Sequence, residues 1–226
     1  MKPLALDLCC GLGGWSRGLF DAGWDVTGFD IEAWPNYPGK LVLKDVRQVT
    51  GQMIEHVEGR KISLVCASPP CQEFSYRSFP FKRCRELAAT VPPDKSIWEA
   101  CERIAKECNA PLVLENVRGA QKYMGKAKAH YGPFYLWGDV PAMLPIGKPC
   151  KGFVHRRDKN GKAMGWKSGS ERIKFPGEME RHKWGWANMQ MAQHSSHSQK
   201  RKEFSAQAAM IPIELSTWIG QCFYPR

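Results

Sequence analysis

The feature that most constrains the fold is an alternation of short apolar runs and amphipathic stretches over the first 120 residues. The first run, Leu4–Leu8, passes through a glycine-rich turn into residues 15–22, whose apolar side chains recur at helical spacing before Gly23. Such alternation is typical of an α/β fold with a mainly parallel sheet. The same patterns predict strands at 24–30, 41–43, 61–67 and 111–115 and helices at 47–55 and 96–108, the latter capped by Ser96.

The pattern changes after Trp137. Residues 138–202 are rich in Gly, Pro, Lys and Arg and show no sustained hydrophobic period. Helical spacing returns within 206–223, where Pro212 suits a first turn. A chain of 226 residues is long enough for one domain with a small additional lobe. We therefore expect a main domain over 1–137, a small basic region over 138–202, and a C-terminal helix over 203–226 that returns to the main domain.

Positive charge is concentrated in one part of the chain. The formal net charge is +11, and residues 148–202 alone hold 14 Lys and Arg against 4 Asp and Glu. Cations interleaved with aromatic side chains favour a polyanion with bases to contact, which indicates nucleic acid rather than a merely solvated face. The aromatic residues of this segment are Phe153, Trp166, Phe175, Trp184 and Trp186.

Several classes of protein are disfavoured. No apolar run approaches the roughly 20 residues of a membrane span, and the N-terminus has no signal-peptide layout, so we expect a cytoplasmic protein without a membrane partner. Nine cysteines are an odd number in a chain that can bury its own core, which argues against a disulfide scaffold. No metal is expected, because no Cys-x-x-Cys pair accompanies Cys150, His182, His194 and His197. The cysteines expected in the core are Cys9, Cys66, Cys101, Cys108 and Cys222.

The turn after the first strand has the sequence DLCCGLGG at residues 7–14. Glycines there let a ligand approach the backbone, and the N-terminus of the following helix favours an anionic group. Asp30 ends the second expected strand, where a carboxylate can hold a ribose, and Asp45 ends the third, within reach of an adenine edge. These strand ends predict an adenosine-bearing cofactor, and ATP is disfavoured because the sequence has no Walker lysine motif.

Two further motifs follow expected strands. In SPPCQEF at residues 68–74, two prolines fix the backbone and project Cys71 from the carboxyl edge of the sheet, where ligands of α/β proteins bind. Cys71 is therefore a candidate nucleophile. In LVLENV at residues 112–117, a buried strand brings Glu115 to the same edge, where it is either a catalytic carboxylate, a helix cap or one half of a structural ion pair.

Together these motifs resemble those of the cytosine-C5 DNA methyltransferases, which use S-adenosylmethionine. The glycine-rich turn, Pro-Pro-Cys-Gln at 69–72 and Glu-Asn-Val at 115–117 occur in the family's order, and the resemblance covers about residues 4–120 with a weaker echo at 205–219. It implies a Rossmann-like methyltransferase fold in which 1–137 bind S-adenosylmethionine and catalyse, and 138–202 form a small basic target-recognition lobe. Small members of this family often come from phages, and the length of this chain resembles theirs.

The resemblance also implies a chemistry and a set of site residues. Cys71 attacks C6 of cytosine so that C5 takes the methyl group, while Glu115 contacts N3 and the amino group and supports protonation at N3. The target base must first leave the stack of double-stranded DNA. The implied cofactor-binding residues are Asp7, Cys10, Gly11, Gly13, Gly14, Asp30, Ile31, Asp45, Val46 and Pro69. The residues expected at the nucleic acid are Pro70, Gln72, Asn116, Arg118, Arg156, Arg157, Lys200 and Arg201.

The sequence departs from the family in two places. The family's Gln-x-Arg-x-Arg segment, whose arginines help to hold the cytosine, is replaced by YGPFYLWG at residues 131–138, which contains no arginine. The late Gly-Asn-Ser-Val segment, which completes the cofactor pocket, corresponds only to QAAMIP at 207–212. The cations available to replace the missing arginines are Lys126, Lys128, Arg156 and Arg157.

Three functions are compatible with these observations. The first is methylation of cytosine C5 in double-stranded DNA by a monomeric enzyme. The second is the same chemistry on RNA, since one branch of the family methylates tRNA. The third is a nucleic-acid-binding protein that has lost catalysis, which the missing arginines motivate. The intact cysteine and glutamate motifs favour an enzyme, and we expect DNA as its substrate.

Overall fold

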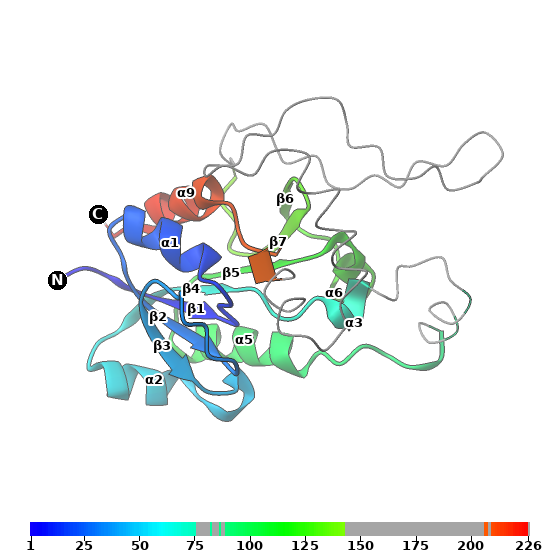
Figure 1. Cartoon of the computed structure of the whole chain (residues 1–226), viewed down its shortest axis with the longest axis horizontal. Coiled ribbons are helices and arrows are strands. Elements are labelled where there is room, and N and C mark those ends of the chain that lie inside the picture. The colour runs from blue at the N-terminus through cyan, green and yellow to red at the C-terminus, as the bar shows by residue number, and fades with distance from the viewer. Residues whose placement is uncertain (76–81, 83–85, 87–88, 143–205, 208, 226) are drawn as a thin grey trace. The chain divides into compact units, whose positions relative to one another are not determined.

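The computed structural model describes residues 1–75, 82, 86, 89–142, 206–207 and 209–225 (Figure 1). Its centre is a seven-stranded sheet with the order β3-β2-β1-β4-β5-β7-β6. Neighbours among the first five strands are parallel, whereas β7 is antiparallel to both β5 and β6. The prediction of an α/β fold with a mainly parallel sheet is therefore confirmed. The strands are β1 (Leu4–Leu8), β2 (Asp25–Asp30), β3 (Lys40–Leu43), β4 (Ile62–Ala67), β5 (Leu112–Asn116), β6 (Ala129–Tyr131) and β7 (Phe134–Gly138).

Strands β6 and β7 form a hairpin that the hydrophobic pattern does not reveal. Its turn contains Gly132 with φ 60°, a left-handed conformation that suits glycine, and it is followed directly by Pro133. Tyr131 and Phe134 pair across this turn and are both buried. The hairpin places Leu136 opposite Glu115, so it covers the edge of β5 that a parallel strand would otherwise occupy.

Helices cover both faces of the sheet. In Figure 1, α1 (Gly14–Asp21) and α9 (Ile213–Phe223) lie on one side of the strands, and α2 (Gly51–Glu58) and α5 (Ser96–Glu107) lie on the other. The alternating side chains of the central strands belong to two separate clusters of buried apolar residues, one on each face of the sheet. Shorter elements are η1 (Val46–Gln48), α3 (Gln72–Ser75), η3 (Arg118–Ala120) and α6 (Gln121–Met124).

Helices α1 and α9 approach each other closely because glycine lies at their contact. A Cβ atom at Gly18 would lie 2.0 Å from Ser216 Oγ, and one at Gly220 would lie 2.6 Å from Ala22 Cβ. The Trp24 indole donates a hydrogen bond of 2.9 Å to the Gly220 carbonyl, across 196 positions of sequence. The C-terminal residues therefore pack onto the N-terminal part of the sheet.

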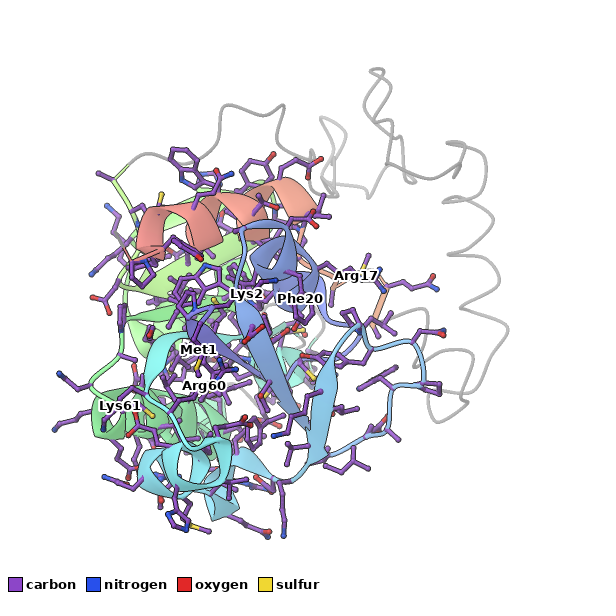
Figure 2. The ribbon with its side chains drawn as sticks, turned by 90° about the vertical axis from the view of Figure 1, so that its left-hand side faces the viewer. Met1, Lys2, Arg17, Phe20, Arg60 and Lys61 are labelled. Atoms are coloured by element: carbon purple, nitrogen blue, oxygen red, sulfur yellow. The ribbon has the colours of Figure 1, made fainter. Side chains whose placement is uncertain are left out.

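The strands β1, β2 and β4 begin at one end of the sheet, where Arg60 ties the chain together. Its guanidinium donates to the Lys2 carbonyl at 3.2 Å and to the Asp25 carboxylate at 2.8 Å. Figure 2 faces this end and shows Arg60 near Lys2. The carboxyl ends of the parallel strands, which carry the sequence motifs, lie at the opposite edge of the sheet.

Two expected helices differ in detail from the structure. The helix expected over 47–55 is divided into η1 and α2, because Asp45 caps the first by accepting from the Arg47 amide and Thr50 caps the second. Ser96 is not the cap of α5; it is the first helical residue, and the Asp94 carboxylate accepts its amide hydrogen at 2.8 Å.

Of the cysteines expected in the core, Cys66, Cys101 and Cys108 are buried and Cys9 is half-buried. Cys222 is exposed, so that expectation was wrong. It lies in the last turn of α9, where Gln221 and Tyr224 are exposed as well.

The division at residues 137 and 202 stays a prediction, because most of 138–202 lies outside the described residues. Within the described part of the chain, no helix is long and apolar enough to cross a bilayer. The same part contains no group of three His, Cys, Asp or Glu side chains arranged to hold a metal ion.

Candidate active site

The three motifs converge at the carboxyl edge of the sheet. From β1 the chain passes to β2 on one side, whereas β4 adjoins β1 on the other side, so the strand order reverses at β1. Open α/β sheets bind ligands outside the carboxyl ends of the strands at such a point. The glycine-rich turn follows β1, the Pro-Pro-Cys loop follows β4, and Glu115 lies near the end of β5.

The glycine-rich turn is a chain of left-handed residues held by the neighbouring strand. Gly11 has φ 49° and Gly13 has φ 77°, which only glycine adopts without strain, and Cys9 adopts φ 57° despite its side chain. The Gly11 amide donates to the Asp30 carboxylate on β2 at 2.9 Å. A Cβ at Gly13 would lie 2.6 Å from Pro38 Cδ, so this turn also needs glycine for space.

Asp7 lies under this turn and is completely buried. Its Oδ2 atom accepts two hydrogen bonds from Ser16, one from the amide at 3.1 Å and one from the hydroxyl at 2.6 Å. Its Oδ1 atom has no hydrogen-bond partner. Burial, and to a smaller extent the charge of Asp30, raises the pKa of Asp7 to about 7, against the hydrogen bonds from Ser16. An orphaned carboxylate oxygen beneath a glycine-rich turn fits a ligand that carries an ammonium group.

Three residues farther along this edge have properties that suit the rest of an adenosine-bearing ligand. Asp30 accepts from the Glu32 amide through its second oxygen, and the apolar Ile31 side chain beside it is 73% exposed. Asp45 binds the Arg47 guanidinium, and this hydrogen bond holds the pKa of the Asp45 carboxyl below its ordinary value.

Two other residues expected at the cofactor have side chains in the protein interior. The Val46 side chain lies in the core, so a ligand at this position would meet its backbone. Cys10 is also buried, and its amide donates to the Phe29 carbonyl.

The Pro-Pro-Cys loop is fixed from two sides. The Ser68 amide donates to the Leu8 carbonyl at 3.1 Å, and the Asn116 side chain donates to the Pro69 carbonyl at 2.9 Å. Asn116 is 1% exposed, so the residue after Glu115 acts as a buried clamp on this loop. Pro69 is buried, whereas the expected nucleic-acid residues Pro70 and Gln72 are exposed.

Cys71 follows the prolines and is half-buried. Burial raises the pKa of its thiol, and the nearby Glu115 raises it further, while a hydrogen bond from Ser75 acts in the opposite direction. The hydrogen bond from Asn116 to the Pro69 carbonyl joins the two motifs, so Cys71 and Glu115 belong to adjacent segments at this edge. A thiol in this environment is protonated at neutral pH.

Glu115 is 9% exposed, and burial raises its pKa to about 8. A hydrogen bond from the Ser68 hydroxyl opposes this increase. The Ser68 oxygen in turn accepts from the Trp15 indole at 3.0 Å. Because Trp15 follows the glycine-rich turn in α1 and Ser68 begins the Pro-Pro-Cys loop, this bond joins the first and second motifs, and the sequence alone does not reveal it.

The expected nucleic-acid residues fall into two groups. Arg118 is exposed in η3, close in sequence to Glu115. The remaining four, Arg156, Arg157, Lys200 and Arg201, lie outside the described residues.

Lys128 is a candidate replacement for the missing arginines, and it immediately precedes β6. The next residue, Ala129, pairs with Leu136, which in turn pairs with Glu115, so Lys128 lies two strands away from β5. It lines a pocket with Asp139 and Cys222. Its replacement of an arginine at the site stays a prediction.

Comparison with known proteins assigns the chain to a family. Residues 4–129, more than half of the chain, match the model of the C-5 cytosine-specific DNA methylases. The chain belongs to this family. The matched residues include all three motifs, and membership implies S-adenosylmethionine as the methyl donor. No curated protein matches the methylase chain.

Three solved structures that are similar to the methylase share little sequence identity with it. A DNA modification methyltransferase encoded within an E. coli prophage is 22% identical, with a TM-score of 0.40 over 55% of this chain and 35% of that one. Spodoptera frugiperda DNMT2 is 21% identical, with a TM-score of 0.37 over 54% and 37%. Magnesium protoporphyrin IX methyltransferase from Synechocystis, solved with bound SAM, is 16% identical, with a TM-score of 0.33 over 53% and 51%. The methylase thus matches about a third of the length of the prophage enzyme.

Proposed function

We propose that the methylase transfers a methyl group from S-adenosylmethionine to C5 of cytosine in double-stranded DNA, through a covalent adduct with Cys71. The observation that carries this proposal is the convergence of Cys71 and the buried Glu115 at one strand edge, beside the glycine-rich turn. Cytosine C5 is a poor nucleophile, and this pair supplies what its activation needs, a thiol and a neutral acid.

Cys71 forms the first bond. Its thiol loses a proton to water, and the thiolate sulfur adds to C6 of the ring. The electron pair of the C5–C6 bond is displaced toward N3, which takes a proton from Glu115. With a pKa of about 8, Glu115 holds its proton at pH 7 and is available as this acid. A neutral Glu115 also removes the negative charge that opposes the thiolate.

The remaining steps restore the base. When bound, S-adenosylmethionine supplies an electrophilic methyl group to C5. A base, such as water, then removes the C5 proton, and the electron pair left behind expels the Cys71 thiolate as the C5–C6 double bond forms again. The N3 proton returns to the Glu115 carboxylate and the Cys71 thiolate regains a proton from water, so both residues end the cycle as they began it.

The residues at the carboxyl edge fit the methyl donor. The orphaned Oδ1 of Asp7 would accept from the ammonium group of its methionine part, and the turn at Gly11 and Gly13 lets that part approach the backbone. Asp30 would hold the ribose hydroxyls and Asp45 the adenine. The positions of Cys10, Gly14, Ile31, Val46 and Pro69 at this edge are consistent with contacts to the same ligand.

Base flipping is part of the proposal because Glu115 is buried. Its side chain is 9% exposed, so a cytosine stacked inside a duplex cannot reach it. Rotating the base out of the helix costs a few kcal/mol, which contacts with the backbone must supply. The exposed Arg118 and the excess of cations within 148–202 are suited to phosphate contacts, and we propose that a single chain acts alone.

The decisive experiment is expression in a bacterial host that lacks cytosine methylation, with 5-methylcytosine mapped by conversion sequencing. Wild type should methylate a fixed sequence context, and Cys71→Ala should leave the genome unmodified. Cys222→Ala is the matched control, since this exposed cysteine lies outside the site, and it should methylate as wild type does.

The other functions give different results in the same strains. Label transferred from S-adenosylmethionine to tRNA but not to DNA would show that the substrate is RNA. Salt-sensitive DNA binding without any methyl transfer, unaffected by Cys71→Ser, would show a binding protein without catalysis. Either result would overturn the proposal.

A further inference from the structure

Ser68 is a polar residue at the centre of the site that the motifs do not explain. Its oxygen accepts from the Trp15 indole nitrogen at 3.0 Å. The register of β4 and β5 pairs Ala67 with Leu114, so the residues that follow, Ser68 and Glu115, are neighbours across the two strands. Its own amide is fixed to the Leu8 carbonyl. The side chain is thus held between the helix that follows the glycine-rich turn and the buried carboxyl.

The chemistry of the three groups fixes the direction of these hydrogen bonds. An indole N–H is a donor only, so the Ser68 oxygen must accept from Trp15. The single hydrogen of the Ser68 hydroxyl is then free to be donated, and a carboxylate is an acceptor. The hydrogen of Ser68 is therefore available to the neighbouring Glu115, which accepts it best when it is ionised.

Trp15 is 1% exposed, so the indole N–H that donates to Ser68 belongs to a side chain that is itself fixed in the core. A hydrogen bond to a charged group is stronger than one between neutral groups, and it strengthens when its donor is polarised by a second bond. The contact is therefore suited to holding one oxygen of Glu115 in place while a proton leaves the carboxyl group.

We propose that Ser68 is a positioning residue that stabilises the Glu115 carboxylate formed when this acid gives its proton to the cytosine ring. This inference rests on the proposed function for its catalytic part. Burial alone would make Glu115 too weak an acid to donate at neutral pH, and the Ser68 hydroxyl counteracts burial. Because Trp15 holds Ser68, the acidity of Glu115 also depends on Trp15, and hence on the packing of the glycine-rich turn.

The test measures the ionisation of Glu115 directly. The side-chain carboxyl carbon is titrated by NMR in protein labelled with ¹³C-glutamate, and the Glu115 signal is assigned as the one that Glu115→Gln removes. In Ser68→Ala the pKa of Glu115 should rise by about one unit. Ser68→Thr, which keeps a hydroxyl, should restore the wild-type value.

Two further variants make the result specific. Ser63→Ala is the matched control, because it makes the same change on β4 at the other end of the strand, and it should leave the Glu115 titration unchanged. Trp15→Phe keeps an aromatic ring but removes the N–H, so the pKa of Glu115 should rise by less than in Ser68→Ala. Trp15→Phe is also the test variant if Ser68→Ala does not fold. An unchanged titration in Ser68→Ala or, failing that, in Trp15→Phe overturns the proposal.

Kinetics then test the catalytic part. In Ser68→Ala, kcat for methyl transfer should fall about tenfold with KM for DNA unchanged, and the alkaline limb of the pH profile should move upward with the pKa of Glu115. A lower kcat with an unmoved alkaline limb would assign Ser68 a purely structural role. Because the NMR titration needs no turnover, a shifted titration together with an inactive wild type would refute the proposed function and not the hydrogen-bond chain.

Discussion

Replacing Glu115 with glutamine should make the methylase more stable at alkaline pH, by an amount that the burial of this carboxyl sets. The pKa of Glu115 is raised from its ordinary value of 4.5 to about 8 in the folded protein. Between these values the folded state binds a proton that the unfolded chain has lost. The free energy of unfolding therefore falls as the pH rises through this window.

The size of the effect follows from the two pKa values. Burying Glu115 costs about 2 kcal/mol at pH 6, where the folded group keeps its proton, and about 4.5 kcal/mol at pH 8.5, where it does not. Between pH 6 and pH 8.5, the free energy of unfolding of wild type should therefore fall by about 2.5 kcal/mol relative to that of Glu115→Gln. Glutamine has nearly the same shape as glutamate, so the two proteins differ mainly in charge. Titrating groups that Glu115 does not affect, such as Asp7, contribute equally to both proteins and cancel.

Urea unfolding followed by tryptophan fluorescence at several pH values between 6 and 8.5 measures this difference. Glu99→Gln, an exposed position on α5, is the matched control and should follow wild type. Stability curves of wild type and Glu115→Gln that run parallel over the whole interval would refute the reasoning, because they would show that Glu115 ionises in the folded protein as it does in the unfolded chain.

Three further changes test other parts of the structure. Asn116→Ala removes the clamp on the Pro69 carbonyl and should lower the unfolding free energy by about 1–3 kcal/mol in urea titrations; an unchanged value would show that the loop holds itself. Gly18→Ala places a Cβ 2.0 Å from Ser216 Oγ and should cost about 1–3 kcal/mol in thermal unfolding, although alanine normally favours a helix; a gain in stability would mean that α1 and α9 separate easily. Asp7→Asn should weaken binding of S-adenosylhomocysteine about tenfold by calorimetry while increasing stability above pH 7; equal affinity would remove Asp7 from the cofactor site.

The sheet and the meeting of the three motifs could be predicted because buried parallel strands leave continuous apolar runs in a sequence. Leu4–Leu8 and Ile62–Ala67 are such runs, and a motif directly follows each of them. Once the strands are parallel, the residues after them must share one edge. Cys71 and Glu115 therefore approach each other as a consequence of topology alone.

The rest depends on contacts that periodicity does not encode. Strand β6 has three residues, too few for an alternating pattern, and its hairpin therefore escapes prediction. The bond between Trp15 and Ser68 spans 53 positions and depends on the orientation of both side chains. Cys222 lies three residues after the buried Ile219, so helical spacing predicts burial, but the helix is no longer covered there.

The contact between α1 and α9 has a consequence for the order in which the methylase can mature during synthesis. A Cβ at Gly14 would lie 2.5 Å from the Ile211 amide, and the Trp24 indole donates to the Gly220 carbonyl 196 positions later in the sequence. Until α9 has been translated, the apolar face that carries Trp15 and Leu19 lacks this helix as cover. A nascent chain therefore contains the Pro-Pro-Cys and Glu-Asn-Val motifs long before the helix that follows its glycine-rich turn is fully packed.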